Sequence, residues 1–182
     1  MDEPGPSLLR LARNAIGEHF GVAPLAVAER PELQAPGASF VTLTQHGELR
    51  GCIGSLEAYR PLADDVRANA RAAAFRDPRF PPLTVDELPR TRIEVSLLTP
   101  AEPLPCRDEA EALTLLRPHI DGIILSAGRQ RATFLPQVWE QLPEPADFLA
   151  HLKRKAGLPT AYWGADLRLE RYTVKKWQEE TP

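Results

Sequence analysis

The chain has 182 residues, 43% of them hydrophobic, and a formal net charge of −3 at neutral pH. The length suits one well-buried core or two lobes, and the acidic balance lacks the basic footprint of a nucleic-acid binder. No run approaches the roughly 18 apolar residues that span a bilayer, and the chain starts acidic where a secretory signal is basic. We therefore expect a cytoplasmic protein with no nucleic-acid and no membrane partner.

A helix and a β-hairpin are predicted first along the chain. Ser7 can cap a helix whose apolar positions in residues 8–20 follow the helical period, with Gly21 as its stop. Residues 39–44 and 48–56 are rich in strand-forming types and flank a turn, so they predict the two strands of the hairpin.

The next segment predicts a helix, a capped turn and a strand. Pro61 starts a helix that runs to Phe75, and Asp77-Pro78 ends it. Thr84 and Glu87 have the spacing of a capping box. Residues 92–97 alternate between apolar and polar types, which is typical of a half-buried strand.

The second half of the chain begins with a proline-rich segment at 99–106, the best candidate for a boundary between lobes. We then expect a helix at 108–117 and a hairpin with strands at 122–126 and 132–135. A short helix that begins at residue 136, a helix at 146–156 and a strand at 167–174 should follow. Mixed helices and hairpins without regular strand-helix alternation predict an α+β fold, with a mostly antiparallel sheet and flanking helices.

The hexapeptide at 49–54 places Cys52 near two glycines at the end of a predicted strand. In an extended strand Arg50 and Cys52 share a face, roughly 7 Å apart, where a guanidinium can favour a thiolate. Gly51 and Gly54 would leave room for the approach of a substrate. The alternative is a cysteine that packs as a small hydrophobe, and the hexapeptide alone favours it.

Five further residues are candidates for the same site. Glu94 occupies an outward-facing strand position, where it can act as a proton-transfer group or an arginine partner, or face solvent. Asp77, Arg79 and Phe80 lie in a proline-bounded loop that can deliver a polar group and an aromatic lid, although helix termination explains the aspartate as well. Thr133 can donate a hydroxyl, or serve simply as a strand residue.

The remaining chemistry-bearing residues do not predict a further site. Cys52 and Cys106 are too few for a disulfide scaffold, so we expect two reduced thiols. The four histidines fall in no catalytic or metal-binding motif, so we expect no metal site.

Five motifs in order make the chain resemble the AMMECR domain family, called AmmeMemoRadiSam system protein A in bacteria and archaea. They are LRGCIG (49–54), FRDPRFPPL (75–83), IEVSLLTP (93–100), TFLPQV (133–138) and KRKAGL (153–158). The resemblance runs from the first helix to about Val174. It implies one domain over 1–182, with interleaved lobes around a cleft, and it implies a pathway shared with Memo-like and radical S-adenosylmethionine proteins as possible partners.

Two functions follow from these residues. The first is an enzyme without a cofactor that acts on a small, anionic substrate, with Cys52 as nucleophile, Arg50 as anion binder and Glu94 as proton-transfer group. The second is a non-catalytic domain whose cleft binds a metabolite or a segment of a partner protein, with the cysteine only lining it.

Overall fold

The computed structural model describes residues 3–180, which divide into two compact units. The first comprises the described residues up to Leu98 and those from Lys175 onward, and the second is Thr99–Val174. The second unit is thus an insertion in the first, and the chain passes between them twice. Within residues 3–180, no helix is long and apolar enough to cross a membrane.

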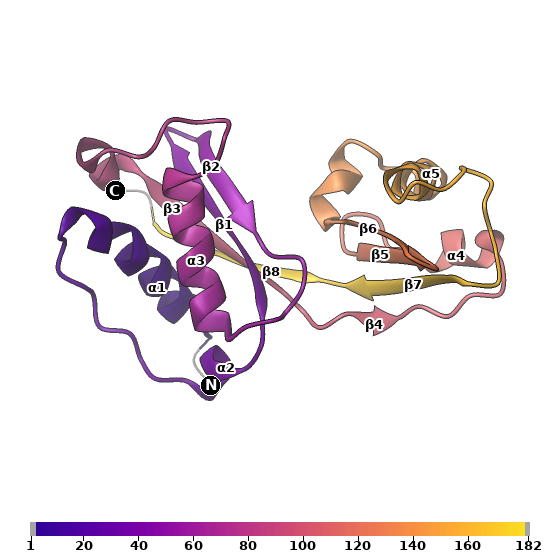
Figure 1. Ribbon diagram of the computed structural model, residues 1–182, viewed down its shortest axis with the longest axis horizontal. Coiled ribbons are helices and arrows are strands. Elements are labelled where there is room, and N and C mark those ends of the chain that lie inside the picture. The colour runs from indigo at the N-terminus through magenta and orange to yellow at the C-terminus, as the bar shows by residue number, and fades with distance from the viewer. Residues whose placement is uncertain (1–2, 181–182) are drawn as a thin grey trace. The chain divides into compact units, whose positions relative to one another are not determined.

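The first unit combines a four-stranded sheet with helices (Figure 1). Its helical elements are α1 (Gly5–Gly17), η1 (Glu18–Phe20), α2 (Pro31–Gln34), α3 (Leu62–Phe75) and η2 (Val85–Arg90). Its strands are β1 (Ala38–Gln45), β2 (Glu48–Gly54), β3 (Arg92–Leu98) and β8 (Val174–Gln178), in the order β2-β1-β3-β8. Strand β1 pairs antiparallel with both β2 and β3, so the β2 edge of the sheet comes from the hairpin.

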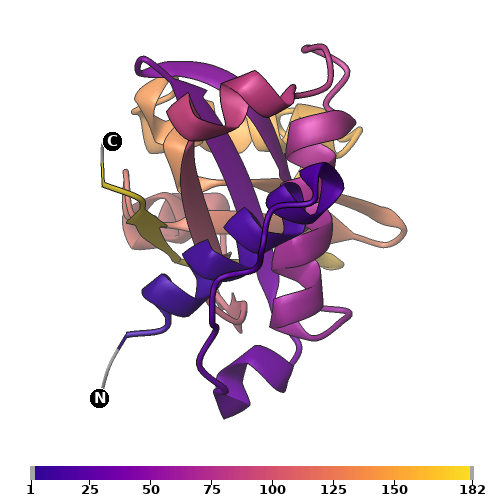
Figure 2. The same ribbon diagram turned by 90° about the vertical axis from the view of Figure 1, so that its left-hand side faces the viewer.

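Helices α1 and α3 lie against one face of this sheet (Figure 2). Val41 and Leu43 of β1 and Ile93 and Val95 of β3 are fully buried in the core that the sheet shares with the helices. Because neighbouring side chains on a strand point to opposite faces, the alternate positions of β1 and β3 point away from the helices.

The second unit has its own antiparallel sheet and core. Its elements are β4 (Glu102–Pro103), α4 (Glu109–Leu115), β5 (Gly122–Ala127), β6 (Gln130–Phe134), η3 (Pro136–Glu140), α5 (Pro145–Lys155) and β7 (Leu167–Tyr172), with strand order β4-β7-β5-β6. The fully buried Trp139 stacks on Phe148 with ring centroids 3.7 Å apart. This stack packs η3 against α5.

The structure confirms the predicted α+β class, with two antiparallel sheets and accompanying helices, and it corrects several local boundaries. Ser7 does not cap α1 but lies buried inside it, because the helix already begins at Gly5. Pro61 is the residue before α3 instead of its first residue. Strand β8 was missed because its two exposed lysines hide the alternation.

A buried carboxylate, Asp65 in α3, fastens this helix to the hairpin. Its side chain is 0% exposed and accepts hydrogen bonds from the backbone N–H and hydroxyl of Ser39 at 2.8 and 2.7 Å. The Ser55 hydroxyl, Asn69 Nδ2 and Arg60 Nε also donate to it, at 2.6, 2.9 and 2.8 Å. These five donors offset the cost of burying the charge.

We expect Asp65→Ala to lower the free energy of unfolding by about 3 kcal/mol or more, because it leaves Arg60 and several buried donors without an acceptor. The matched control is Asp64→Ala, whose side chain is 60% exposed and pairs with the exposed Arg67, so about 1 kcal/mol or less is expected. Urea denaturation of both variants measures the difference, and equal losses would contradict the structural role of Asp65.

Candidate functional site

A β-bulge interrupts β2 at Arg50. Leu43 of β1 pairs with Gly51 whereas Thr44 pairs with Leu49, so Arg50 is the extra residue. A bulge breaks the alternation of side chains between the two faces. We expected Arg50 and Cys52 to share a face because side chains alternate along a regular strand. The bulge at Arg50 removes the basis of that prediction.

The Arg50 guanidinium is instead engaged by Glu87 of η2. Nε and Nη2 donate to the two carboxylate oxygens at 2.9 and 3.1 Å, and the Arg50 side chain is only 11% exposed. The bond from Arg50 holds the pKa of Glu87 at about 2, although burial alone would raise it. Glu87 also accepts from the Thr84 backbone, which confirms the capping box. Arg50 therefore joins η2 to the hairpin.

Cys52 belongs to a polar row that crosses the sheet on the face opposite α1 and α3. Thr42 of β1 is its pairing partner, and the Thr42 Oγ1 and Cys52 Sγ atoms are 3.3 Å apart. Thr42 also pairs with Glu94 of β3, whose Oε1 lies 3.6 Å from Nζ of Lys176 in β8. Two strand spacings of about 4.8 Å separate Cys52 from Glu94, so Glu94 reaches the thiol only through Thr42 or a bound molecule.

The backbone of Cys52 is held at the sheet edge by a loop instead of a neighbouring strand. Its N–H donates to Asp77 Oδ2 at 2.9 Å, and its carbonyl accepts from Arg79 Nη2 at 3.2 Å. Arg79 in turn donates to Asp77 through Nε and Nη2, at 3.0 and 2.7 Å. Its guanidinium lies 5.5 Å from the centre of the Phe80 ring. The loop at 77–80 thus covers the edge of β2 at the cysteine.

Asp77 stays ionised in this position. The hydrogen bonds from the Arg79 side chain hold its pKa far below the usual 3.8, against burial that raises it, and the N–H groups of Cys52 and Arg79 lower it further. Asp77 reciprocally raises the pKa of Arg79, and a Cys52 thiolate acts in the same direction. Arg79 therefore interacts electrostatically with the cysteine, while the Arg50 guanidinium is engaged by Glu87.

Both glycines of the motif have packing roles. A Cβ on Gly51 would stand 2.2 Å from the Ala73 carbonyl oxygen, so glycine allows the backbone of α3 to approach β2. A Cβ on Gly54 would stand 2.2 Å from the Phe40 ring, which occupies that space. Gly51 thus makes room for a helix, and Gly54 makes room for an aromatic ring.

Thr133 and Cys106 belong to the second unit. The Thr133 hydroxyl lies 3.1 Å from that of Tyr172, and its carbonyl accepts from Lys155 at 2.9 Å. Cys52 and Cys106 are both free and half-buried. A contribution of Thr133 to the cysteine site stays a prediction.

Thr42 and Lys176 were not singled out from the sequence. A regular register counted from the turn at 46–47 would pair Thr42 with Gly51, and only the bulge at Arg50 moves that pairing to Cys52. Lys176 requires the missed strand β8. No cluster of three or more His, Cys, Asp or Glu side chains suited to a metal ion occurs in the described part of the chain.

Comparison with known proteins places similarity along nearly the whole chain. Residues 9–177 match the family described as AMMECR1. A protein from Methanothermobacter thermautotrophicus is 39% identical, with 98% of this chain and 95% of the relative covered, and one from Methanocaldococcus jannaschii is 35% identical, with 99% and 92% covered. The crystal structure of an uncharacterised protein from Pyrococcus horikoshii is similar with a TM-score of 0.79 and 34% identity, over 100% of this chain and 94% of that chain.

We expect iodoacetamide to label Cys52 faster than Cys106 at pH 7. Burial raises the pKa of the Cys106 thiol, and Glu111 and Asp108 raise it further, so little of the reactive thiolate is present there. Peptide mapping of the folded protein after timed labelling measures both rates. Equal rates, or faster labelling of Cys106, would indicate that Cys52 is packed and inert.

Arg79→Gln should slow the labelling of Cys52 at pH 7, because it removes the guanidinium that binds the Cys52 carbonyl and helps to hold the cysteine in place. Arg50→Gln is the matched control, and we expect a smaller effect because that guanidinium is committed to Glu87. A larger effect of Arg50→Gln would contradict the assignment of Arg79 as the arginine that holds the cysteine.

Proposed function

This chain belongs to the AMMECR1 family, and from that premise we propose that it is a thiol-dependent enzyme in which Cys52 attacks a small, anionic substrate. The proposal includes a pathway shared with Memo-like and radical S-adenosylmethionine proteins, which the resemblance of the five motifs implies. No cofactor takes part in the proposed step.

The observation that carries the proposal is the double anchoring of the Cys52 backbone. A carboxylate that is 1% exposed and a guanidinium bind the N–H and the carbonyl of this one residue. A thiol that only fills space in a core needs no such fixation. A nucleophile benefits from it, because attack requires the sulfur to be held in a defined position.

The polar row supports proton transfer from the thiol. Sulfur attacks as the thiolate, so the proton must leave it first. The Thr42 hydroxyl at 3.3 Å is the adjacent polar group, and Glu94 is the carboxylate next in the row. We assign Thr42 to orient the thiol and to relay its proton: the Thr42 hydroxyl takes up the proton from sulfur as it gives its own proton to the Glu94 carboxylate.

Arg79 suits the recognition of an anionic substrate better than Arg50 does. The Arg79 side chain is 54% exposed beside Cys52, while that of Arg50 is largely buried in its pair with Glu87. A partly exposed guanidinium can bind a carboxylate or a phosphate without losing the hydrogen bonds that hold the loop.

One observation favours the alternative of a non-catalytic binding or adaptor domain. Glu94 Oε1 lies 3.6 Å from Nζ of Lys176, so this carboxylate already has a cationic partner within the row. In that case the polar row would serve only to bind a metabolite or a partner segment.

The replacement Cys52→Ser separates the two functions. If Cys52 is the nucleophile, the variant should fold with unchanged thermal stability but fail to restore function in a deletion strain, because a serine hydroxyl is a far weaker nucleophile than a thiol. Cys106→Ser is the matched control and should restore function. Full complementation by folded Cys52→Ser would exclude the nucleophile and favour the binding domain.

A further inference from the structure

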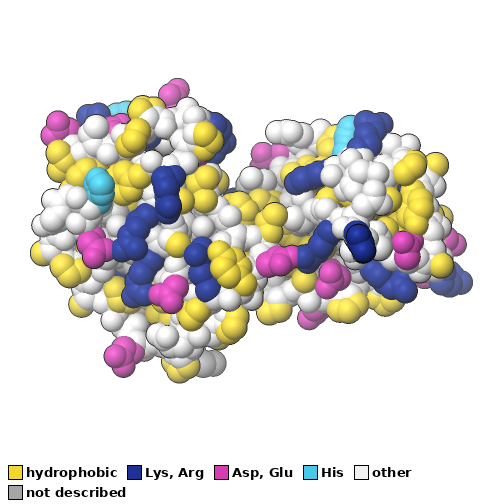
Figure 3. Space-filling view, viewed as in Figure 1, with side chains coloured by type: hydrophobic (Ala, Val, Ile, Leu, Met, Phe, Trp, Pro, Cys, Tyr) yellow, Lys and Arg dark blue, Asp and Glu magenta, His cyan; other side chains and the backbone are white. Residues whose placement is uncertain are grey.

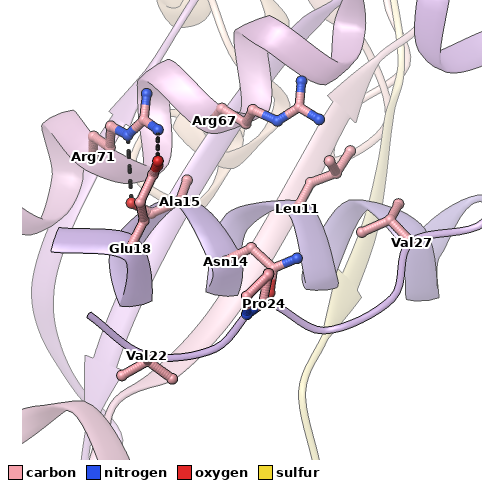
Figure 4. A pocket seen from close by; sticks show the side chains of 9 residues that line it. All are labelled: Leu11, Asn14, Ala15, Glu18, Val22, Pro24, Val27, Arg67 and Arg71. Carbon is pink, nitrogen blue, oxygen red and sulfur yellow. Dashed lines mark hydrogen bonds and ion pairs between the residues drawn. The ribbon is translucent and has the colours of Figure 1, made fainter. Parts of the chain in front are cut away.

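A pocket of about 350 Å³ lies in the helical layer of the first unit, away from the polar row (Figure 4). Its walls come from α1, η1, the segment that follows η1, and α3. They consist of Leu11, Asn14, Ala15, Glu18, Val22, Pro24, Val27, Arg67 and Arg71. The volume is at the lower end of the roughly 300–1,000 Å³ typical of small-molecule sites.

The segment that forms one wall is fastened to α1. Asn14 binds Leu25 with both ends of its amide: Nδ2 donates to the Leu25 carbonyl at 2.8 Å, and Oδ1 accepts from the Leu25 N–H at 2.7 Å. Arg10 Nη1 donates to the Ala26 carbonyl at 3.1 Å. These bonds hold Pro24 and the apolar side chains of Val22 and Val27 beside Leu11, so the pocket is formed before any ligand enters.

Two arginines of α3 form the polar side of the pocket. Arg67 and Arg71 are one helical turn apart and therefore lie on the same face of α3 (Figure 4). The face of the molecule on which α3 and α1 lie shows a row of basic side chains (Figure 3).

The ion pairs of these arginines are exposed. Arg67 pairs with Asp64 at 3.1 Å, with side chains 44% and 60% exposed, and Arg71 pairs with Glu18. Such pairs contribute only about 0–1 kcal/mol, so a ligand anion can compete with them.

We propose that this pocket binds a small carboxylate with an apolar body. The apolar body contacts Leu11, Val22 and Val27, and the carboxylate binds Arg67 and Arg71. Glu18 and Asp64 balance the two arginines, so a ligand must compete with these exposed pairs. A single carboxylate meets less repulsion from the two acidic side chains than a phosphate, which carries additional charge.

The test is a titration of the full chain with sodium octanoate. Isothermal titration calorimetry measures the affinity, and amide shifts in nitrogen-15 NMR spectra locate the binding site. Octanoate should bind wild-type protein and shift the amides of Asn14 and Leu25. Arg67→Gln combined with Arg71→Gln should weaken binding about tenfold or more, since charge-assisted hydrogen bonds are lost. Arg76→Gln, at the end of α3 and outside the pocket, should leave the dissociation constant unchanged.

Two further measurements separate the contributions of shape and charge. Val22→Trp, at a side chain that is 48% exposed, should fill the pocket and abolish binding while both arginines remain. 1-Octanol, which has the same chain without the charge, should bind wild-type protein at least tenfold more weakly than octanoate. Thermal unfolding of each variant verifies that it is folded.

The proposal is overturned if octanoate does not bind, if the double arginine variant binds it as tightly as wild-type protein, or if octanol binds as tightly as octanoate. Folded Cys52→Ser should bind octanoate with wild-type affinity, because the cysteine and the pocket belong to opposite sides of the sheet. Absence of octanoate binding would therefore leave the proposed role of Cys52 unaffected. Full complementation by Cys52→Ser would likewise leave the proposed pocket unaffected.

Discussion

The candidate site depends on the hydrogen bonds that the buried carboxylate of Asp77 accepts. This carboxylate binds the N–H of Cys52 and the side chain of Arg79, which binds the Cys52 carbonyl. An edge strand exposes unpaired backbone groups that invite pairing with another chain, and here two side chains occupy those groups at the cysteine. The same contacts hold the thiol in place. Protection of the edge and positioning of the sulfur therefore have one physical origin.

Two buried aspartates, one in the first turns of α3 and one just past its end, orient this helix on the hairpin. Asp65 in its first turns binds Ser39 of β1 and Ser55 just beyond β2, and Asp77 just past its end binds Cys52 within β2. Gly51 lets the helix approach closely between these anchors. A buried charge is costly unless its partners are correctly placed, so each aspartate disfavours other positions of the helix.

The helical layer and the opposite face of the first sheet carry different chemistry. Helix α3 turns its buried alanines toward the sheet and Arg67 and Arg71 toward the pocket, as its amphipathic sequence requires. On the other face of the sheet, Cys52 and Glu94 stand on either side of Thr42. A ligand in the pocket and a substrate at the thiol would thus contact separate residues of one unit, which lets each be altered without the other.

The features that depend on neighbouring residues could be predicted from the amino-acid sequence. These are the helical and strand periods, the hairpin turn, the capping box of Thr84 and Glu87, and with them the α+β class. The contacts of the candidate site depend instead on the tertiary fold. The bulge removed Arg50 from the predicted alternation, Glu87 engaged it from 37 residues away, and Asp77 reached Cys52 across 25 residues. Periodicity reports which face a side chain takes on a regular strand, but the partner of a charged group depends on every charge and backbone group that folding brings within reach.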